Sequence, residues 1–204
     1  HGTKITNARF GSPVVTYKSI AHISKSILSQ SGVVLHRLYI SKSPAVGDRG
    51  AATLAQGLLH NKTLTVLSLT ECSLTQDGAK YLANALRRNR TLNRLSLEGN
   101  AISDTGFREL CHHVVLGKEE STPSALTSLN LSQCGITDAG VFNMPPTAQL
   151  KELHLSRNDI SDAGVLHLAH AVMDSDAMTH LYINNNPKQK STRLNSSHMS
   201  ESRM

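Results

Sequence analysis

Residues 64–106, LTVLSLTECSLTQDGAKYLANALRRNRTLNRLSLEGNAISDTG, contain one pattern written twice. Each position of the first copy returns 28 residues later, as Leu64 does at Leu92 (92 − 64). A fixed period of this size is typical of an array of stacked repeats. The recurring residues are Leu64, Leu67, Leu69, Cys72, Leu74 and Gly78, which return as Leu92, Leu95, Leu97, Asn100, Ile102 and Gly106.

The pattern starts again at Leu35, Leu126, Leu150 and Met178, so we predict a repeat array over residues 35–186. The unit that begins at Leu126 is short, because the next one starts only 24 residues later (150 − 126). Pro145 and Pro146 lie in that unit and exclude a regular helix at their position. We expect a single helical turn or an extended connection there.

Three segments depart from the pattern. In residues 1–34, apolar residues at helical spacing predict an amphipathic helix over residues 16–29 that ends near Gly32. We interpret residues 1–34 as a degenerate N-terminal repeat, with residues 5–10 as its first half. Residues 117–125 form a polar insertion. Residues 187–204 lack the pattern, and we interpret them as a disordered tail of non-native origin. The chain begins with His1 rather than Met, so we expect a fragment of a longer protein.

Each unit predicts a short strand followed by a helix. The x-L-x-L segment has the period of two that a strand with one buried face requires. The Asn or Cys that follows is expected to satisfy backbone groups inside the turn. Asp77, Asp104, Asp138 and Asp162 precede a Gly and are expected near the positive ends of the helices. One unit cannot bury its apolar face alone, so the units must stack.

The pattern L-x-x-L-x-L-x-x-(N/C)-x-(L/I) resembles that of leucine-rich-repeat proteins. The period and the alternation of Cys72, Asn100, Cys134 and Asn158 resemble the ribonuclease-inhibitor-like subclass. Similar repeats occur in ribonuclease inhibitor, NLR sensor regions, Ran GTPase-activating protein, tropomodulin-like proteins and dynein regulatory subunits. The resemblance implies an α/β solenoid, a curved horseshoe with parallel strands on its concave face and helices on its convex face.

Composition restricts the function further. Aromatic residues make up 3% of the chain, so the core must be aliphatic. Half of the net charge of +6 comes from residues 187–204, and the rest is too scattered to indicate nucleic-acid binding. No apolar run is long enough to span a membrane. Three cysteines do not make a disulfide framework, and free thiols favour a cytoplasmic location.

The outward-facing strand residues form the expected binding surface, because repeat proteins use their concave faces in this way. Arg and Tyr are favoured interface anchors, and the mixed charges favour a protein partner over nucleic acid. The alternative is that these are ordinary solvated side chains. The residues that we predict to contact the partner are Arg37, Tyr39, Arg94, Glu98, Glu152, His154 and Tyr182.

Other candidate sites have structural explanations. His112, His113, His167 and His170 lack a third ligand at a suitable spacing, so we interpret the helical histidines as solvated and expect no metal or other cofactor. Cys111 falls in an inward slot and is expected to be an inert thiol. Three N-x-S/T sequences, at Asn61, Asn89 and Asn130, arise from the repeat itself, and we expect Asn61 and Asn89 to adopt a left-handed, helix-stopping conformation.

No catalytic fingerprint is present, so the leading hypothesis is a non-enzymatic scaffold that binds a protein through its concave face. Two alternatives remain open. One is a Ran-type GTPase-activating regulator, for which no catalytic residue can be assigned in this chain. The other is a structural spacer within a longer repeat array. The leucine pattern does not decide among the three, because the recurring residues are the buried ones.

Overall fold

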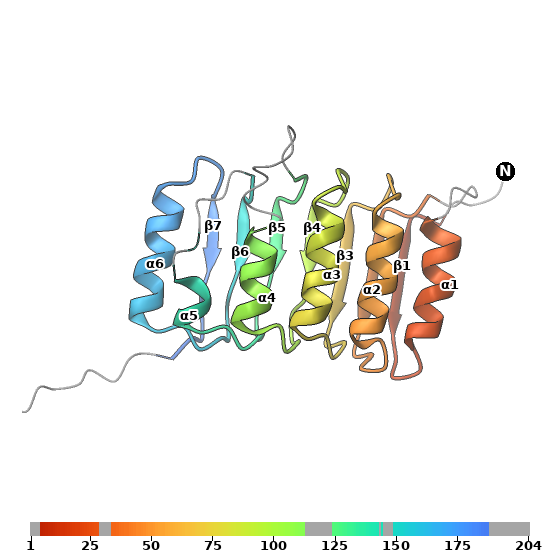
Figure 1. The fold of residues 1–204 in the computed structure, drawn as a ribbon, viewed down its shortest axis with the longest axis horizontal. Helices are drawn as coiled ribbons and strands as arrows, with labels where there is room; N and C mark the ends of the chain where they lie inside the picture. Colours follow the sequence, from red (N-terminus) through yellow and green to blue (C-terminus); the bar gives the residue numbers. More distant parts are fainter. Residues whose placement is uncertain (1–4, 29–33, 113–123, 143, 145–148, 188–204) are drawn as a thin grey trace, which may run out of the picture.

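The computed structural model describes residues 5–28, 34–112, 124–142, 144 and 149–187. Within them, all strands join one parallel sheet whose order follows the chain from β1 to β7 (Figure 1). The insertion at residues 117–125 lies mostly outside the described residues, as does the tail after Pro187. The strands are β1 (Asn7–Gly11), β2 (Arg37–Ser41), β3 (Val66–Thr70), β4 (Arg94–Ser96), β5 (Ser128–Asn130), β6 (Glu152–His154) and β7 (His180–Tyr182).

One helix follows each of the first six strands, and all the helices lie on the same face of the sheet (Figure 1). No other described element covers the opposite face. The predicted α/β solenoid, with strands on one face and helices on the other, is therefore confirmed. The helices are α1 (Tyr17–Leu28), α2 (Gly47–Leu58), α3 (Gln76–Leu86), α4 (Ser103–Leu110), α5 (Asp138–Val141) and α6 (Asp162–Met173).

The strand register follows the repeat register. Leu67 pairs with Leu95 and Leu95 with Leu129, so equivalent leucines form rows that run through the sheet. These inward leucines are almost completely buried and belong to one continuous core. Stacking the repeats thus buries an apolar face that a single repeat would expose to water.

The first strand and helix join the same stack. β1 pairs along its whole length with β2, and α1 buries Ile20 in the common core. The helix predicted over residues 16–29 is observed as Tyr17–Leu28, whereas the stop expected at Gly32 lies outside the described residues. At the short unit, α5 is a single turn of four residues, as Pro145 and Pro146 led us to expect.

The Asn/Cys position ties each repeat to the one before it. The Asn100 side-chain oxygen accepts hydrogen bonds from the backbone N–H groups of Cys72 and Leu74, each at 3.0 Å. Its amide nitrogen donates to the carbonyl oxygens of Leu69 and Leu97, each at 2.7 Å. Asn158 makes the corresponding four bonds, with the N–H groups of Cys134 and Ile136 and the carbonyl oxygens of Leu131 and Leu155. One buried side chain therefore satisfies backbone groups in two consecutive repeats.

The smaller residues at this position make fewer bonds. The Cys134 thiol donates to the Leu97 carbonyl at 3.3 Å, and the Ser43 hydroxyl donates to the Ser12 carbonyl at 2.8 Å. Neither side chain accepts hydrogen bonds from described N–H groups of the preceding turn, as the Asn100 side-chain oxygen does. The asparagines therefore carry more of the polar contact between repeats than the cysteines do.

A second ladder of carboxylates joins the helix N-termini. Asp48 accepts hydrogen bonds from the N–H and hydroxyl of Thr75, and Asp104 does the same for Thr137. Asp138 repeats the arrangement with Ser161. The carboxylate also explains the following glycines, because a Cβ on Gly140 would lie 2.4 Å from Asp104 Oδ1 and one on Gly164 2.3 Å from Asp138 Oδ1.

Asp77 lies in the first turn of α3, as expected, but it does not take part in this carboxylate ladder. Its register position is one residue too late, and the equivalent of Asp48 and Asp104 is Gln76. The residue that an Asp at position 76 would cap, Ser103, has a φ of 59°, whereas Thr75 and Thr137 are extended. The Ser103 N–H instead donates to the Cys134 carbonyl at 2.9 Å. The carboxylate ladder is thus interrupted at one repeat.

The Asn61 and Asn89 side chains end the helix-to-strand loops in a different way from the one predicted. Both residues are buried, and neither is among the described residues with positive φ. The Asn61 oxygen accepts from the N–H groups of Thr63 and Leu64, at 3.0 and 2.7 Å. Asn89 makes the same loop bonds and also donates to the Asn61 carbonyl at 3.1 Å. The structural interpretation stands, but the left-handed conformation is wrong.

Replacing Asn100 by Ala should lower the free energy of unfolding by roughly 3 kcal/mol, because two buried N–H groups and two carbonyls lose their partner. Urea unfolding followed by circular dichroism measures the loss. Asn84→Ala is the matched control, since Asn84 is exposed on α3 and its loss should change stability by less than about 0.5 kcal/mol. Equal losses in the two variants would contradict the assigned role of Asn100.

Replacing Gln76 by Asp should restore the interrupted ladder and raise the free energy of unfolding by about 1 kcal/mol, through a capping bond to Ser103 and the helix dipole. Gln76→Glu adds the same charge on a longer side chain and should give only the dipole part, about 0.3 kcal/mol. Chemical unfolding compares the two variants. Equal effects would show that the register position makes no specific bond.

Candidate protein interface

The uncovered face of the sheet carries a shallow open groove of about 810 Å³. Side chains from β2 to β6 line it, because every second residue of a strand points away from the helices. The register aligns these residues into rows that cross the strands, one of which runs through Tyr39, Ser68, Ser96, Asn130 and His154. The groove therefore has a defined sequence of side chains from one end of the sheet to the other.

Small side chains line part of the floor of the groove. Ser68 and Ser96 occupy the middle of the row, with Ser128 beside them. Tyr39 and His154 stand at the two ends, about 19 Å apart at the usual spacing between strands. Two aromatic side chains thus border a floor of hydroxyl groups that could receive an inserted segment.

Tyr39 is held in place by a neighbour that the sequence did not single out. The Arg9 guanidinium lies over the Tyr39 ring, 4.8 Å from its centroid. Such a contact is worth about 0.5–1 kcal/mol at an exposed site. Arg9 was missed because the leucine pattern is absent from residues 1–34, although Ala8 and Phe10 pack on the core on either side of it.

The other end of the groove carries a stack of three rings. His154 and Tyr182 are nearly parallel, with centroids 4.2 Å apart and planes inclined by 11°. His180 continues the stack at 6.0 Å from Tyr182. Partial burial lowers the pKa of His154; the nearby Glu152 and Glu98 oppose this shift, and His180 reinforces it. His154 is therefore mainly neutral at pH 7 and acts as an aromatic surface.

The charges of the groove are unevenly placed. Arg37 and Arg94 lie at the starts of β2 and β4, and no hydrogen bond or ion pair to either side chain is found among the described residues. Glu98 lies beyond the end of β4, where it accepts a hydrogen bond from Asn130 at 3.1 Å. Glu152 starts β6. The groove is consequently positive at β2, of mixed charge at β4 and negative at β6.

The structure brings the seven predicted contact residues together on this face. Arg37, Tyr39, Arg94, Glu152 and His154 line the groove. Glu98 and Tyr182 adjoin it, through Asn130 and His154 respectively. Ser132, which follows β5 at the spacing of an outward-facing residue, is buried. The chain has already left the strand at that residue, so the alternation no longer applies.

The remaining candidate side chains are occupied structurally. His167 is half-buried and meets the edge of Phe142 at 4.7 Å, so the expectation of a solvated side chain is wrong for this histidine. His170 is exposed, and His113 lies outside the described residues. Burial raises the pKa of the Cys72 thiol to about 11 and those of Cys111 and Cys134 to about 12. These thiols are protonated and unreactive at pH 7.

Two features are absent from the part of the chain that the structure describes. No group of three His, Cys, Asp or Glu side chains is placed there to hold a metal ion. No helix there has the length and apolar character needed to cross a membrane.

The chain is similar to known leucine-rich-repeat sequences and structures. A family model described as "Leucine Rich repeat" matches residues 60–83, 88–111, 124–144 and 149–169. Leiomodin-1 actin-binding site 2 is 12% identical, with a TM-score of 0.52 over 83% of this chain and 80% of that one. The Caenorhabditis elegans tropomodulin C-terminal domain is 11% identical, with a TM-score of 0.51 over 83% of each chain. No curated protein sequence matches the chain significantly.

These matches and the continuous parallel sheet identify the chain as a leucine-rich-repeat protein. Leucine-rich-repeat domains generally mediate interactions between proteins. At such low identity, the two structural matches show the fold alone.

The pKa of His154 should lie below that of a free histidine and should rise towards it in Tyr182→Ala, because removing the stacked ring exposes the imidazole. Because the pKa of His154 is lower in the folded than in the unfolded chain, the neutral imidazole stabilises the fold. This contribution is fully present above the unfolded-state pKa of His154 and is lost as the pH falls through its folded-state pKa. An NMR titration of the imidazole protons measures both variants. A His154 pKa that Tyr182→Ala leaves unchanged would contradict the role of the stack.

Proposed function

We propose that this protein is a non-enzymatic scaffold that binds a protein partner through the concave groove. The observation that carries the proposal is the groove between Tyr39 and His154, whose floor of small side chains leaves room for an inserted segment. The proposed contacts are Arg37 and Tyr39 on β2, Arg94 and Glu98 at the two ends of β4, and Glu152, His154 and Tyr182 on β6 and β7. Tyr and Arg at the centre of a desolvated patch are the residues most often found as binding hot spots.

The mixed charge favours a protein over a nucleic acid. A phosphate backbone carries negative charge along its whole length and would meet Glu98 and Glu152 after passing Arg37 and Arg94. A protein segment can place acidic side chains at one end and basic ones at the other. Complementary charges of this kind steer the encounter and suppress wrong partners.

We also propose that the repeats belong to the ribonuclease-inhibitor-like subclass and that the protein is cytoplasmic. The subclass assignment rests on the 28-residue period and on the Asn/Cys position, and the location rests on three buried free thiols. The Ran-type regulator and the structural spacer remain the alternatives. A Ran GTP-hydrolysis assay with added protein tests the first, because a regulator must accelerate hydrolysis.

Tyr39→Ala and Arg94→Glu should each weaken binding of the protein partner at least tenfold, as expected for anchor residues in an interface. The partner is found by affinity purification with quantitative mass spectrometry, using the double variant as the reference. Purified filamentous actin is the first protein to test directly by co-sedimentation, since the similar leiomodin-1 domain is described as an actin-binding site.

Lys18→Glu is the matched control, because Lys18 is exposed on α1 and distant from the groove. This variant should capture the same partner with unchanged affinity. A partner that binds the double variant as tightly as the wild type would exclude the concave groove. Capture of no specific protein by the chain would favour the spacer.

A further inference from the structure

We propose a second binding surface, on the convex side between α2 and α3, that takes an acidic segment of a protein carrying an apolar side chain. This surface, here called the convex groove, is a hollow of about 340 Å³. It is separate from the concave groove, because it lies among helices on the other side of the sheet. Its lining residues are Ala52, Ala55, Gln56, Leu59, Tyr81, Asn84, Ala85, Arg87 and Arg88.

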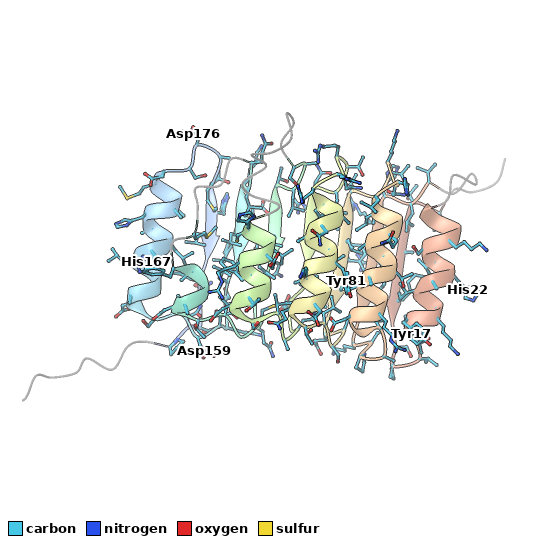
Figure 2. All side chains as sticks on the ribbon, viewed as in Figure 1. Tyr17, His22, Tyr81, Asp159, His167 and Asp176 are labelled. Atoms are coloured by element: carbon cyan, nitrogen blue, oxygen red, sulfur yellow. The ribbon has the colours of Figure 1, made fainter. Side chains whose placement is uncertain are left out.

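Three alanines, Ala52, Ala55 and Ala85, line the floor of the convex groove between the two helices. Tyr81 projects from α3 into the gap beside α2, with 48% of its surface exposed (Figure 2). A partner side chain placed against Tyr81 and Leu59 would remove apolar surface of both molecules from water.

The upper border of the convex groove is basic. Arg87 and Arg88 follow the last turn of α3 and line the hollow. The Arg90 guanidinium donates to the Arg87 carbonyl at 2.6 Å, so this third cation is fixed at the same helix end. Lys62 lies in the neighbouring loop, and the Asn89 side chain joins the two loops by its bond to the Asn61 carbonyl.

The acidic residues of these two repeats, Asp48, Glu71 and Asp77, lie before or at the helix N-termini and not along the parts that build this surface. Neither residues 49–70 nor residues 78–97 contain an Asp or a Glu. No ion pair or hydrogen bond to the side chain of Arg88 or Lys62 is found within the described ranges. The charges of Arg88 and Lys62 are therefore not neutralised by any side chain within those ranges.

The fold itself does not require these cations. Asn61 and Asn89 shape the two loops, and Leu64 and Leu92 fill the core behind them. The corresponding loop after α6 contains Asp174 and Asp176 instead, and Figure 2 shows Asp176 at the same edge of the molecule. Because the loop folds with either charge, the fold does not need the charges of Arg88 and Lys62.

The apolar floor decides between the two kinds of acidic ligand. A nucleic acid would contact the cations through its phosphates and leave the hollow beside Tyr81 unfilled. An acidic amphipathic peptide can pair its carboxylates with Arg88 and Lys62 and place a leucine in the hollow. Grooves between helices are a usual docking site for apolar anchors spaced along such a segment.

The test uses a short fluorescein-labelled peptide of alternating Glu and Leu pairs, with fluorescence anisotropy as the readout. The wild-type chain should bind it, more weakly as salt is added. Arg88→Glu should weaken binding at least tenfold, and Tyr81→Ala about threefold. Lys18→Glu, with the same charge change on α1, should leave binding unchanged. Because Glu near a helix C-terminus is unfavourable, Arg88→Gln is measured as well and should fall between the two.

Three results would overturn the proposal. The first is equal binding by wild type, Arg88→Gln and Tyr81→Ala, with thermal unfolding showing that all are folded. The second is tighter binding of a short oligothymidylate than of the peptide, which would favour nucleic acid. The third is loss of peptide binding in Arg94→Glu alone, which would place the peptide in the concave groove. The two surfaces are therefore tested independently.

Discussion

At Asn100, Asn158 and Asn186, a side chain completes the backbone hydrogen bonding of the preceding repeat. Asn100 accepts from two N–H groups of the preceding turn and donates to a carbonyl on either side of the repeat boundary. Those backbone groups are buried, and water cannot replace the amide without entering the core. An unsatisfied buried N–H or carbonyl costs about 1–3 kcal/mol, so the repeat boundary tolerates few other residues. Burial of the leucine core makes the larger contribution to the stability of the fold. The polar ladder determines the position of each repeat relative to its neighbour.

Two further ladders act at the ends of the helices. Asp48, Asp104 and Asp138 cap the following helix, and Asn89 holds the loop of the preceding repeat. Together the three ladders define where the chain enters and leaves every strand. The rows of the concave face then follow, because a strand fixed at both ends presents alternate residues to the same side. The position of Tyr39 opposite Ser68 is thus a consequence of bonds made on the far side of the sheet.

The sequence predicted the features that the recurring residues determine. It did not predict the contacts made by residues outside that pattern. The fold class, the strand register and the single turn at α5 follow from leucine spacing and two prolines, because both act through burial and backbone sterics. Asp77 lies in the first turn of α3 as expected, but residue spacing did not show that it is one residue out of register with Asp48 and Asp104. Arg9 was missed because its strand carries no leucine pattern, and its contact with Tyr39 appears only when β1 is placed beside β2.

Folding and recognition use different residues in this array. The positions that recur are buried or make ladder bonds, so their chemistry is constrained by the neighbouring repeats. The positions between them, such as Tyr39, Arg94 and His154 on one face and Tyr81 and Arg88 on the other, make few contacts that the fold needs. A change there alters a surface while leaving the ladders intact, and distant sites of this kind combine nearly additively. A solenoid can therefore carry two separate surfaces without either disturbing the stack that supports both.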